Sequence, residues 1–426
     1  MRKLKYPRAR RSRIVDKFHG VSVADPYRWM EKDSQERVDW LNRQEKLTNS
    51  FLRPLADCRS KLYERFIEAG KVGGISMPRL YGKRRFFYKR DSGQEMWVYM
   101  VQDGSDGEPR ILLDPNGWSE NHTTALSGAT PSFNGKLVAY EVSEAGNDKN
   151  SIRVINADTG EILPDVIPAD LYPDLFCWND DNTGFWYRRR LHEKVVAGEE
   201  KRNPRIFFHK VGTNHSEDRI WFTSLPIGKD GWPWVTISDL HRYLVVSVAL
   251  PSSEKGRQDL FVFDTKNPQV GPAPVLRNFT GEFSVDFHND WLVLRINFDG
   301  ADRFKVVKCK ISDITKWNIK WTEIIPEHPS DIISSIDVVG DELFVEYTRD
   351  VTSVVKVYDM DGRFVRDIDL PKGSIWSGLD WDPEVDEMFY SYGSVYSPNV
   401  IVQASRATKE EKIFYCAPGG LDPAKF

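Results

Sequence analysis

Three things are missing from this 426-residue sequence, and each absence argues against a class of protein. No apolar run approaches the ~20 residues that a membrane-spanning helix needs, even at YLVVSVALP from Tyr243. The basic start, MRKLKYPRARRSR, is not followed by an apolar run, which argues against a secretory signal. Arg2 stands where myristoylation needs glycine. We therefore expect neither a membrane partner nor secretion.

Cysteine is also scarce, with four residues far apart at Cys58, Cys177, Cys309 and Cys416. No CxxC pair exists, so we expect no zinc site, no redox motif, and no metal or other cofactor. Isolated cysteines without a secretory signal predict reduced thiols and a cytoplasmic location. The net charge of −4 implies no basic face, so we expect no nucleic-acid partner.

From residue 80 onward, one strand pattern recurs about every fifty residues. The first strand of each copy is apolar or aromatic: RFFYKR at Arg85, LVAYEV at Leu137, GFWYRR at Gly184, YLVVSV at Tyr243, WLVLRI at Trp291, ELFVEY at Glu342 and EMFYSY at Glu387. A second strand follows each of them, starting at Met96, Ile152, Ile206, Leu260, Phe304, Val355 and Val400.

Turn clusters such as SFNGK, FHNDW and VVGDE precede these strands and supply the backbone angles of tight hairpins. Seven copies of this size predict a mainly β fold, a seven-bladed β-propeller. A single four-stranded blade cannot bury both faces, whereas a ring of seven covers each face with a neighbour. A pair of β-sandwiches is the alternative, but the sevenfold repeat favours the propeller.

A helical segment precedes the repeats. Residues 34–56 read as a helix that starts with a capping box of Asp33 and Glu36, and a second helical piece ends at Gly70. Gly73 and Gly74 read as a linker. An apolar stripe runs along the first helix and needs a partner, either the side of the propeller or a further domain; it comprises Val38, Trp40, Leu41, Leu47, Phe51, Leu52 and Leu55.

The stretch FHGVSVADPYRWMEKDSQERVDWLNRQEKLTNSFL resembles the N-terminal region of the prolyl oligopeptidase family. RRFFYKRDSG, ILLDPN, WFTSLP, NFTGEF, IIPEHPSDII and SYGSVYSPNVIVQ follow in family order and spacing. The resemblance implies a propeller that covers an α/β-hydrolase domain on which the N-terminal segment packs. We accordingly expect a helical segment at 1–72, the propeller at 73–417, and the start of a connection to an absent catalytic domain at 418–426.

The family consists of cytosolic serine endopeptidases that usually work as monomers and cleave short peptides after proline, and its propeller excludes large proteins. Its chemistry needs a Ser/His/Asp triad whose serine lies in a Gly-x-Ser-x-Gly elbow. That motif is absent from all 426 residues, so we assign no catalytic residue and expect this chain alone to be inactive. We expect His19, His209, His241 and His288 to be surface or satisfied strand histidines, and Asp180–Asp181 to be turn formers.

The family's propeller also offers an aromatic side chain and an arginine to bound peptide. The aromatic position falls near Tyr172–Pro173 in DLYPDLFCWND, with Phe176 close by. Ala249 stands where the resemblance implies the arginine, in VSVALPSS. These departures weaken the inference of full prolyl specificity.

Two other functions stay open at this point. The chain could be a truncated, non-catalytic propeller that binds peptides or proteins. A propeller of the secreted or lectin type is a weaker alternative, because no calcium-loop or carbohydrate signature stands out.

Overall fold

The computed structural model describes residues 4–146, 149–190, 204–223, 231–238, 241–250, 256–315 and 319–419. The chain divides into two compact units, Met1–Val72 and Gly73–Phe426. Within the described ranges, no helix combines the length and the apolar composition that crossing a bilayer requires. Each unit is described by itself below.

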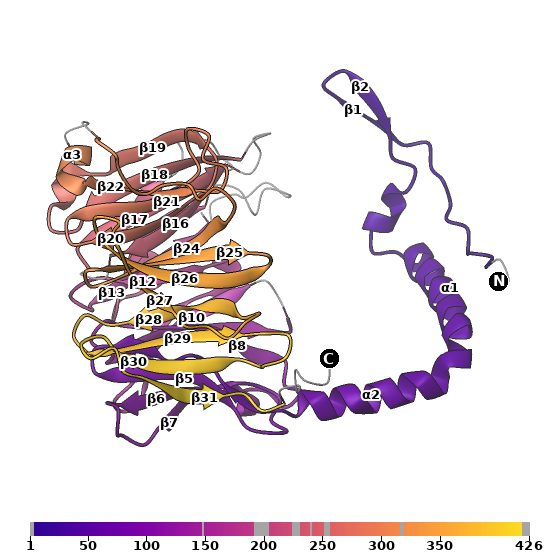
Figure 1. Cartoon of the computed structure of the whole chain (residues 1–426). Coiled ribbons are helices and arrows are strands. Elements are labelled where there is room, and N and C mark those ends of the chain that lie inside the picture. Colours follow the sequence, from indigo (N-terminus) through magenta and orange to yellow (C-terminus); the bar gives the residue numbers. More distant parts are fainter. Residues whose placement is uncertain are drawn as a thin grey trace. The chain divides into compact units, whose positions relative to one another are not determined.

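The N-terminal unit consists of a hairpin followed by two helices (Figure 1). Its elements are β1 (Val15–Phe18), β2 (Val21–Ala24), the 3-10 turn η1 (Arg28–Glu31), α1 (Gln35–Leu52), η2 (Arg53–Leu55) and α2 (Ala56–Gly70). The predicted helix over 34–56 therefore ends at Leu52, and Pro54 falls in η2. Proline has no amide hydrogen and clashes with the preceding turn, so it ends α1.

The helix cap differs from the prediction. Ser34 is the N-cap of α1, and its Oγ accepts a hydrogen bond of 3.3 Å from the Arg37 amide. Asp33 instead pairs with the Arg37 side chain, and Glu36 with Arg10 at 2.7 Å. The predicted capping box of Asp33 and Glu36 was therefore wrong, because the serine one residue later has the extended backbone that a cap needs.

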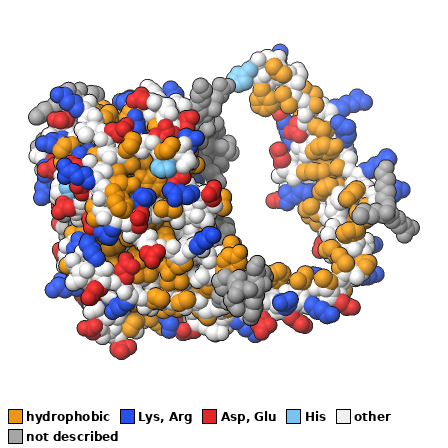
Figure 2. Space-filling model, viewed as in Figure 1, with side chains coloured by type: hydrophobic (Ala, Val, Ile, Leu, Met, Phe, Trp, Pro, Cys, Tyr) orange, Lys and Arg blue, Asp and Glu red, His pale blue; other side chains and the backbone are white. Residues whose placement is uncertain are grey.

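No residue of α1 or α2 is fully buried. Trp29 of η1 is the unit's one buried hydrophobic residue among those described; it packs edge-on against Trp40 with ring centroids 6.5 Å apart. Along α1 and α2 most of the large apolar side chains are exposed, as Figure 2 shows, whereas Trp40 and Leu47 are half-buried. Phe51 is 56% exposed and Phe66 is 72% exposed. The apolar stripe predicted from the sequence thus lacks a covering partner within its unit.

The second unit contains seven antiparallel sheets, the blades of a β-propeller (Figure 1). Each blade has four strands that follow one another in the sheet, and blade 1 also pairs β3 with β5. The strands of blades 1 to 3 are β3 (Gly74–Ile75), β4 (Arg79–Tyr81), β5 (Arg84–Arg90), β6 (Val98–Asp103), β7 (Arg110–Leu113); β8 (Thr124–Pro131), β9 (Leu137–Glu144), β10 (Asn150–Asn156), β11 (Ile162–Ile167); and β12 (Asp174–Trp178), β13 (Gly184–Arg189), β14 (Arg205–Lys210), β15 (Arg219–Thr223).

Blades 4 to 7 repeat this arrangement. Their strands are β16 (Trp232–Ile237), β17 (Tyr243–Leu250), β18 (Arg257–Asp264), β19 (Ala273–Thr280); β20 (Phe283–His288), β21 (Trp291–Ile296), β22 (Lys305–Lys310), β23 (Thr322–Ile325); β24 (Ile332–Val339), β25 (Glu342–Arg349), β26 (Thr352–Asp359), β27 (Phe364–Ile368); and β28 (Ile375–Trp381), β29 (Glu387–Gly393), β30 (Val400–Ser405), β31 (Glu411–Cys416).

Shorter elements lie in the connections between strands, the first two between successive blades and the other three within blades 3, 4 and 5. They are 3-10 turns and one short helix: η3 (Pro115–Gly117), η4 (Ala169–Leu171), η5 (His215–Glu217), η6 (Pro268–Val270) and α3 (Ile311–Thr315). At the start of blade 1, Gly74 of β3 pairs with Arg90 of β5. The predicted linker at Gly73–Gly74 is therefore partly strand, because a glycine pair can also lie flat beside a neighbouring backbone.

The propeller's core lies between the blades. Side chains on the second and third strands of one blade pack on the next blade; the largest cluster of described residues, between blades 4 and 5, includes Leu260, Leu292 and Val307. The cluster between blades 7 and 1 is much smaller and has only three buried members, Leu80, Phe389 and Ile401. We call this interface the seam, and its cluster has the fewest buried members among the described clusters that link two blades.

Side chains from one blade also cap the innermost strand of the next. The Val338 amide donates to Asp286 at 2.6 Å, and the Trp376 amide donates to Ser353 at 2.9 Å. An innermost strand has an unpaired edge toward the axis, so such bonds satisfy amides that lack a strand partner. The blades are thus held together by polar caps as well as by apolar packing.

Candidate functional site

An aromatic cluster lies at the face of the ring where the innermost strands begin, which we call the start face. The cluster consists of Phe176 on β12 and Trp232 and Trp234 on β16, all around Arg188 of β13. The Arg188 guanidinium carbon lies 4.1 Å from the Trp232 ring centroid, 4.6 Å from that of Trp234 and 5.5 Å from that of Phe176. Trp234 is 50% exposed, so the cluster presents an aromatic surface to solvent.

Arg188 is buried beneath this surface. It bonds Asp174, its register partner, at 2.8 Å, and donates to the Pro233 carbonyl at 2.9 Å. Burial lowers the pKa of Arg188, and the Asp174 carboxylate offsets part of that shift. Arg188 therefore acts as a fixed support for the tryptophans, because its donors already have partners.

The predicted aromatic position, Tyr172, lies just before β12 and is half-buried. Its backbone is left-handed, with φ of 49°, and its ring lies between two cations. Arg190 is 3.9 Å and Lys149 is 4.8 Å from its centroid. Pro173 is buried, whereas Phe176 belongs to the aromatic cluster and packs 5.8 Å from Trp234.

Ala249, where the resemblance implied an arginine, lies on β17 opposite Trp232. Its methyl group offers no donor. The guanidinium that lies over Trp232 comes from Arg188, on the neighbouring blade. Sequence reasoning missed Arg188, and the available signal was the GFWYRRR run, in which arginines directly follow a buried aromatic strand.

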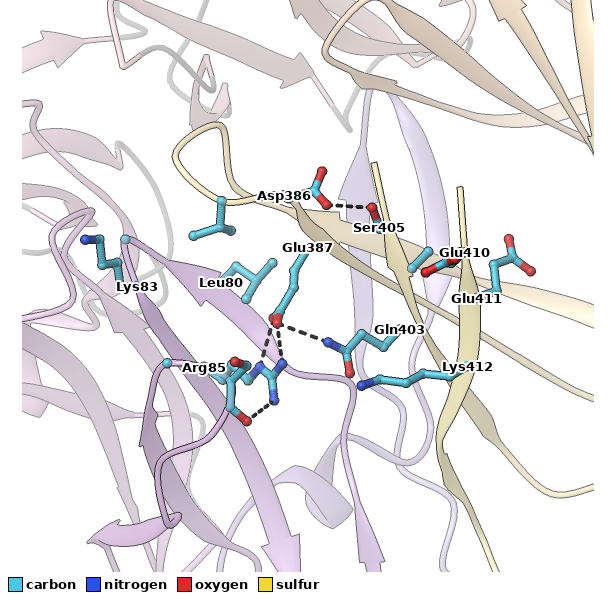
Figure 3. Close-up of a pocket in the computed structure, with 15 residues that line it drawn as sticks. Leu80, Lys83, Arg85, Asp386, Glu387, Gln403, Ser405, Glu410, Glu411 and Lys412 are labelled. Carbon is cyan, nitrogen blue, oxygen red and sulfur yellow. Dashed lines mark hydrogen bonds and ion pairs between the residues drawn. The ribbon is translucent and has the colours of Figure 1, made fainter. Parts of the chain in front are cut away.

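A second feature is the cleft at the seam, with a volume of 780 Å³ (Figure 3). At its floor, Arg85 of blade 1 pairs with Glu387 of blade 7: Arg85 Nε donates to Glu387 Oε2 at 2.9 Å, and its Nη2 bonds the other oxygen. Figure 3 shows the Gln403 amide directed at the same carboxylate, a bond of 3.0 Å. We call Arg85 and Glu387 the seam pair.

Backbone caps close the seam beside this pair. The Leu80 amide donates to Asp380 at 2.7 Å, and the Gly82 amide donates to Asp382 at 3.0 Å. Burial raises the pKa of Asp380 to about 6, although Arg79 at 3.0 Å favours its charged form. Within the described residues, the first and last blades are thus joined by side chains and not by a shared strand.

The four histidines singled out in the sequence occupy different environments. His19 is exposed in the β1–β2 turn, and His209 is buried on β14. His241 stacks on Phe133 with ring centroids 3.4 Å apart, and burial lowers its pKa to about 4. His288 bonds Asp341 at 2.8 Å.

The acidic pair Asp180–Asp181 lies in the turn between β12 and β13. Asp181 accepts from the Thr183 amide at 2.9 Å, which is the role of a turn former.

One serine, one histidine and one aspartate do meet, at Ser330, His328 and Asp331. The Ser330 hydroxyl and the Asp331 amide both approach Nδ1 of His328, at 3.4 and 3.0 Å. Ser330 also donates directly to Asp331 at 2.8 Å. A catalytic triad needs serine and aspartate on opposite ring nitrogens, so this is a local turn and not a triad.

The comparisons with known proteins agree with this architecture. Residues 6–415 match the family described as prolyl oligopeptidase, N-terminal β-propeller domain. The prolyl endopeptidase of Elizabethkingia meningoseptica is 29% identical over 419 residues, which cover 96% of this chain and 57% of that protein. Prolyl oligopeptidase A of Amanita bisporigera is 26% identical over 404 residues, covering 84% of this chain and 51% of that one.

Solved structures give the same result. One chain from a study of two prolyl endopeptidases superposes with a TM-score of 0.84 at 26% identity, covering 98% of this chain and 61% of that one. Prolyl oligopeptidase B of Galerina marginata shares the fold with a TM-score of 0.82 at 21% identity, covering 98% of this chain and 62% of that one. This chain thus spans little more than half the length of these relatives. With nearly all of its residues matched, it belongs to the prolyl oligopeptidase family, as that family's N-terminal segment and β-propeller.

Proposed function

We propose that this chain is the N-terminal and substrate-gating part of a serine-type endopeptidase that cleaves short peptides after proline. The observation that carries the proposal is the continuous match of residues 6–415 to the propeller domain of peptidases. In this proposal the triad belongs to a hydrolase domain outside these 426 residues, since the matched relatives are longer than this chain. The exposed apolar faces of α1 and α2 support it, because such faces need a partner.

The start face is the proposed contact surface for peptide. Phe176 and Trp234 form an exposed aromatic pair, and proline rings bind well in aromatic-lined grooves. Arg188 holds the pair from beneath, and Ala249 leaves room beside Trp232. The surface favours short peptides with proline or another apolar ring.

The seam is the proposed size gate. It has the smallest apolar cluster of the described interfaces, and a cleft of 780 Å³ lies along it. Opening there separates fewer clustered apolar side chains than opening at the other described interfaces, and so costs less hydrophobic stabilisation in this proposal. Breaking the seam pair and the two amide caps at Leu80 and Gly82 admits a short chain but not a folded protein.

We further propose that the complete enzyme works in the cytoplasm as a monomer, on peptides and not on nucleic acids or membranes. Four dispersed cysteines and a net charge of −4 support this.

The catalytic part of the proposal is tested with the purified chain and its transcript. We expect no cleavage of a proline-containing fluorogenic peptide by residues 1–426, because they contain no Gly-x-Ser-x-Gly. We expect the reading frame downstream of codon 426 to encode that motif and a later histidine. Turnover by the chain that a serine-reactive inhibitor blocks, or a stop codon at that point, would contradict the proposal.

The contact surface is tested by peptide binding to the chain, measured by calorimetry with a proline-containing tetrapeptide. Trp234→Ala should weaken binding about tenfold, the loss expected from one aromatic contact of ~1.4 kcal/mol. Phe364→Ala is the matched control, since Phe364 is 54% exposed on the outer strand of blade 6. Equal effects of the two variants would place the peptide elsewhere.

A further inference from the structure

A buried histidine links blades 2 and 3. His209, on β14 of blade 3, is 1% exposed and lies between two aspartates. Its Nδ1 is 3.0 Å from Oδ1 of Asp218, which follows η5 in the same blade. Its Nε2 is 3.1 Å from Oδ1 of Asp165, on the outermost strand of blade 2. Both carboxylates are almost fully buried.

The two distances decide the protonation of the cluster. A neutral imidazole has one N–H, so it can donate to only one of the two carboxylates. Its other nitrogen would then face carboxylate lone pairs at about 3 Å, which is repulsive in a buried site. The imidazolium ion donates to both. Geometry alone therefore favours a doubly protonated ring.

The surroundings agree with this assignment. The titratable or charged groups around the ring are Asp165 of β11, Asp218, and Tyr187 of β13, whose hydroxyl donates to Asp218 at 2.6 Å. Arg189 lies 6.0 Å from the Tyr187 ring. Burial by itself lowers the pKa of His209, but the hydrogen bonds and charges of Asp218 and Asp165 outweigh it and raise that pKa.

We propose that His209, as an imidazolium between Asp165 and Asp218, is a pH-sensitive pin that fastens the outer edge of blade 2 to blade 3. Among the described strands, β11 is the outermost of its sheet and pairs only with β10. When His209 loses its proton to solvent, one of the two ion pairs is lost and Asp165 or Asp218 stays buried without its cation. The pin then weakens and β11 opens more readily.

The direction of the pH effect follows from linkage. The pKa of His209 is higher in the folded chain than in the unfolded chain. The pin's contribution is complete below the unfolded pKa of ~6.5 and is lost as the pH rises through the folded value. Alkaline pH therefore loosens this joint, whereas mild acid does not.

The first test measures the wild-type chain, and a variant is used only to assign its signals. Two-bond ¹H–¹⁵N spectra of the full chain, labelled at histidine, report both ring nitrogens, and His209→Gln assigns the signals. We expect His209 to be doubly protonated at pH 7.5. A neutral His209 at that pH would overturn the proposal.

The second test measures opening of β11. Hydrogen exchange of the amides in Ile162–Ile167 is followed from pH 6 to pH 9 and corrected for intrinsic exchange. Between the unfolded pKa of ~6.5 and the raised folded pKa we expect protection to fall by up to about tenfold per pH unit, as one linked proton requires, and to level off above the folded value. In His209→Gln, protection should be low and independent of pH. His288→Gln, which removes an exposed pair with Asp341, should match the wild type. Flat wild-type protection would overturn the proposal.

Discussion

Gly160 and Gly362 occupy corresponding turns between the third and fourth strands of blades 2 and 6. Both have positive φ, 73° and 83°. A Cβ on Gly160 would meet nothing within 4 Å, whereas a Cβ on Gly362 would lie 1.9 Å from the Ile324 carbonyl oxygen in blade 5. Substituting these two glycines therefore distinguishes the free-energy cost of a left-handed backbone from the additional cost of a clash between blades.

Gly160→Ala should therefore lower the free energy of unfolding by about 1 kcal/mol, the cost of left-handed backbone. Gly362→Ala should cost about 2 kcal/mol more, because the blade 5 carbonyl must also move. Chemical denaturation of the full chain measures both. Equal losses would show that the blades yield freely at this contact.

Val351 is a residue that the local backbone disfavours. It occupies the second position of the two-residue turn between β25 and β26, with φ of 60°, and Asp350 before it has φ of 47°. Such turns favour Asn-Gly, and a β-branched residue is strained there. Val351 is 86% exposed, so it gains no packing in return.

We expect Val351→Gly to raise the free energy of unfolding by about 1 kcal/mol by relieving this strain. Val351→Ala is the control and should change stability much less, since alanine is also disfavoured at positive φ. The midpoint of denaturation measures both. A glycine variant no more stable than the alanine one would contradict the assignment of strain.

Single residues were the level at which the sequence was least informative. The sequence pattern predicts a cap at Asp33, whereas Ser34 makes the bond, because two adjacent residues of equal cap propensity cannot be ranked without backbone angles. Arg188 could not be found from the sequence pattern, because two of its three aromatic neighbours, Trp232 and Trp234, come from β16 in the next blade and lie far from it in sequence.

At the scale of elements, a few side chains make the polar contacts of the seam, and Arg85 is central among them. Arg85 has a side chain that is only 5% exposed, and it lies over the rings of Phe389 and Phe414 at 5.3 and 5.7 Å. Its loss would leave Glu387 partly buried with Gln403 alone. The seam pair therefore contributes more to the stability of the seam than an exposed ion pair would.

Arg85→Met should lower the free energy of unfolding by about 3 kcal/mol, the typical result of removing one partner from a buried pair. Hydrogen exchange at Leu80 and Gly82 should also accelerate. The control Lys356→Met breaks an exposed pair with Asp367 and should cost less than about 0.5 kcal/mol. If both variants behave alike, the seam pair does not hold the ring closed.

The strands were predictable where apolar patterning is strong. The first strand of each sequence repeat is the second strand of a blade. Four of these strands begin at the predicted residues, Tyr243, Trp291, Glu342 and Glu387. The innermost and outermost strands were not named, because they are shorter or more polar and their periodicity is weak. Strands buried on both faces have the clearest pattern.

At the scale of the whole molecule, the exposed helices of the N-terminal unit govern behaviour in solution. Phe51, Leu55, Leu62 and Phe66 are all about half exposed or more. A patch of this kind on an isolated chain drives association. We expect the purified chain to self-associate, even though the complete enzyme is proposed to be a monomer.

The double variant Phe51→Lys and Phe66→Lys should shift the sedimentation of the chain toward the monomer without changing its thermal unfolding. The matched control is Asn49→Lys with Ser60→Lys, which adds the same charge to exposed polar positions of the same helices. If the control disperses the chain equally, net charge and not the apolar face controls association.

The seam also brings two distant parts of the sequence together. Met77, just after the propeller begins, packs in one cluster with Phe414 and Tyr415, near its last strand. A module whose two ends meet can be inserted into a loop of another domain. The two ends of that loop then stay within about the width of one blade of each other. Closing such an insertion costs little chain entropy, because that cost grows only slowly with the length of the inserted segment. The ring can thus evolve, or be permuted circularly, as one transferable piece.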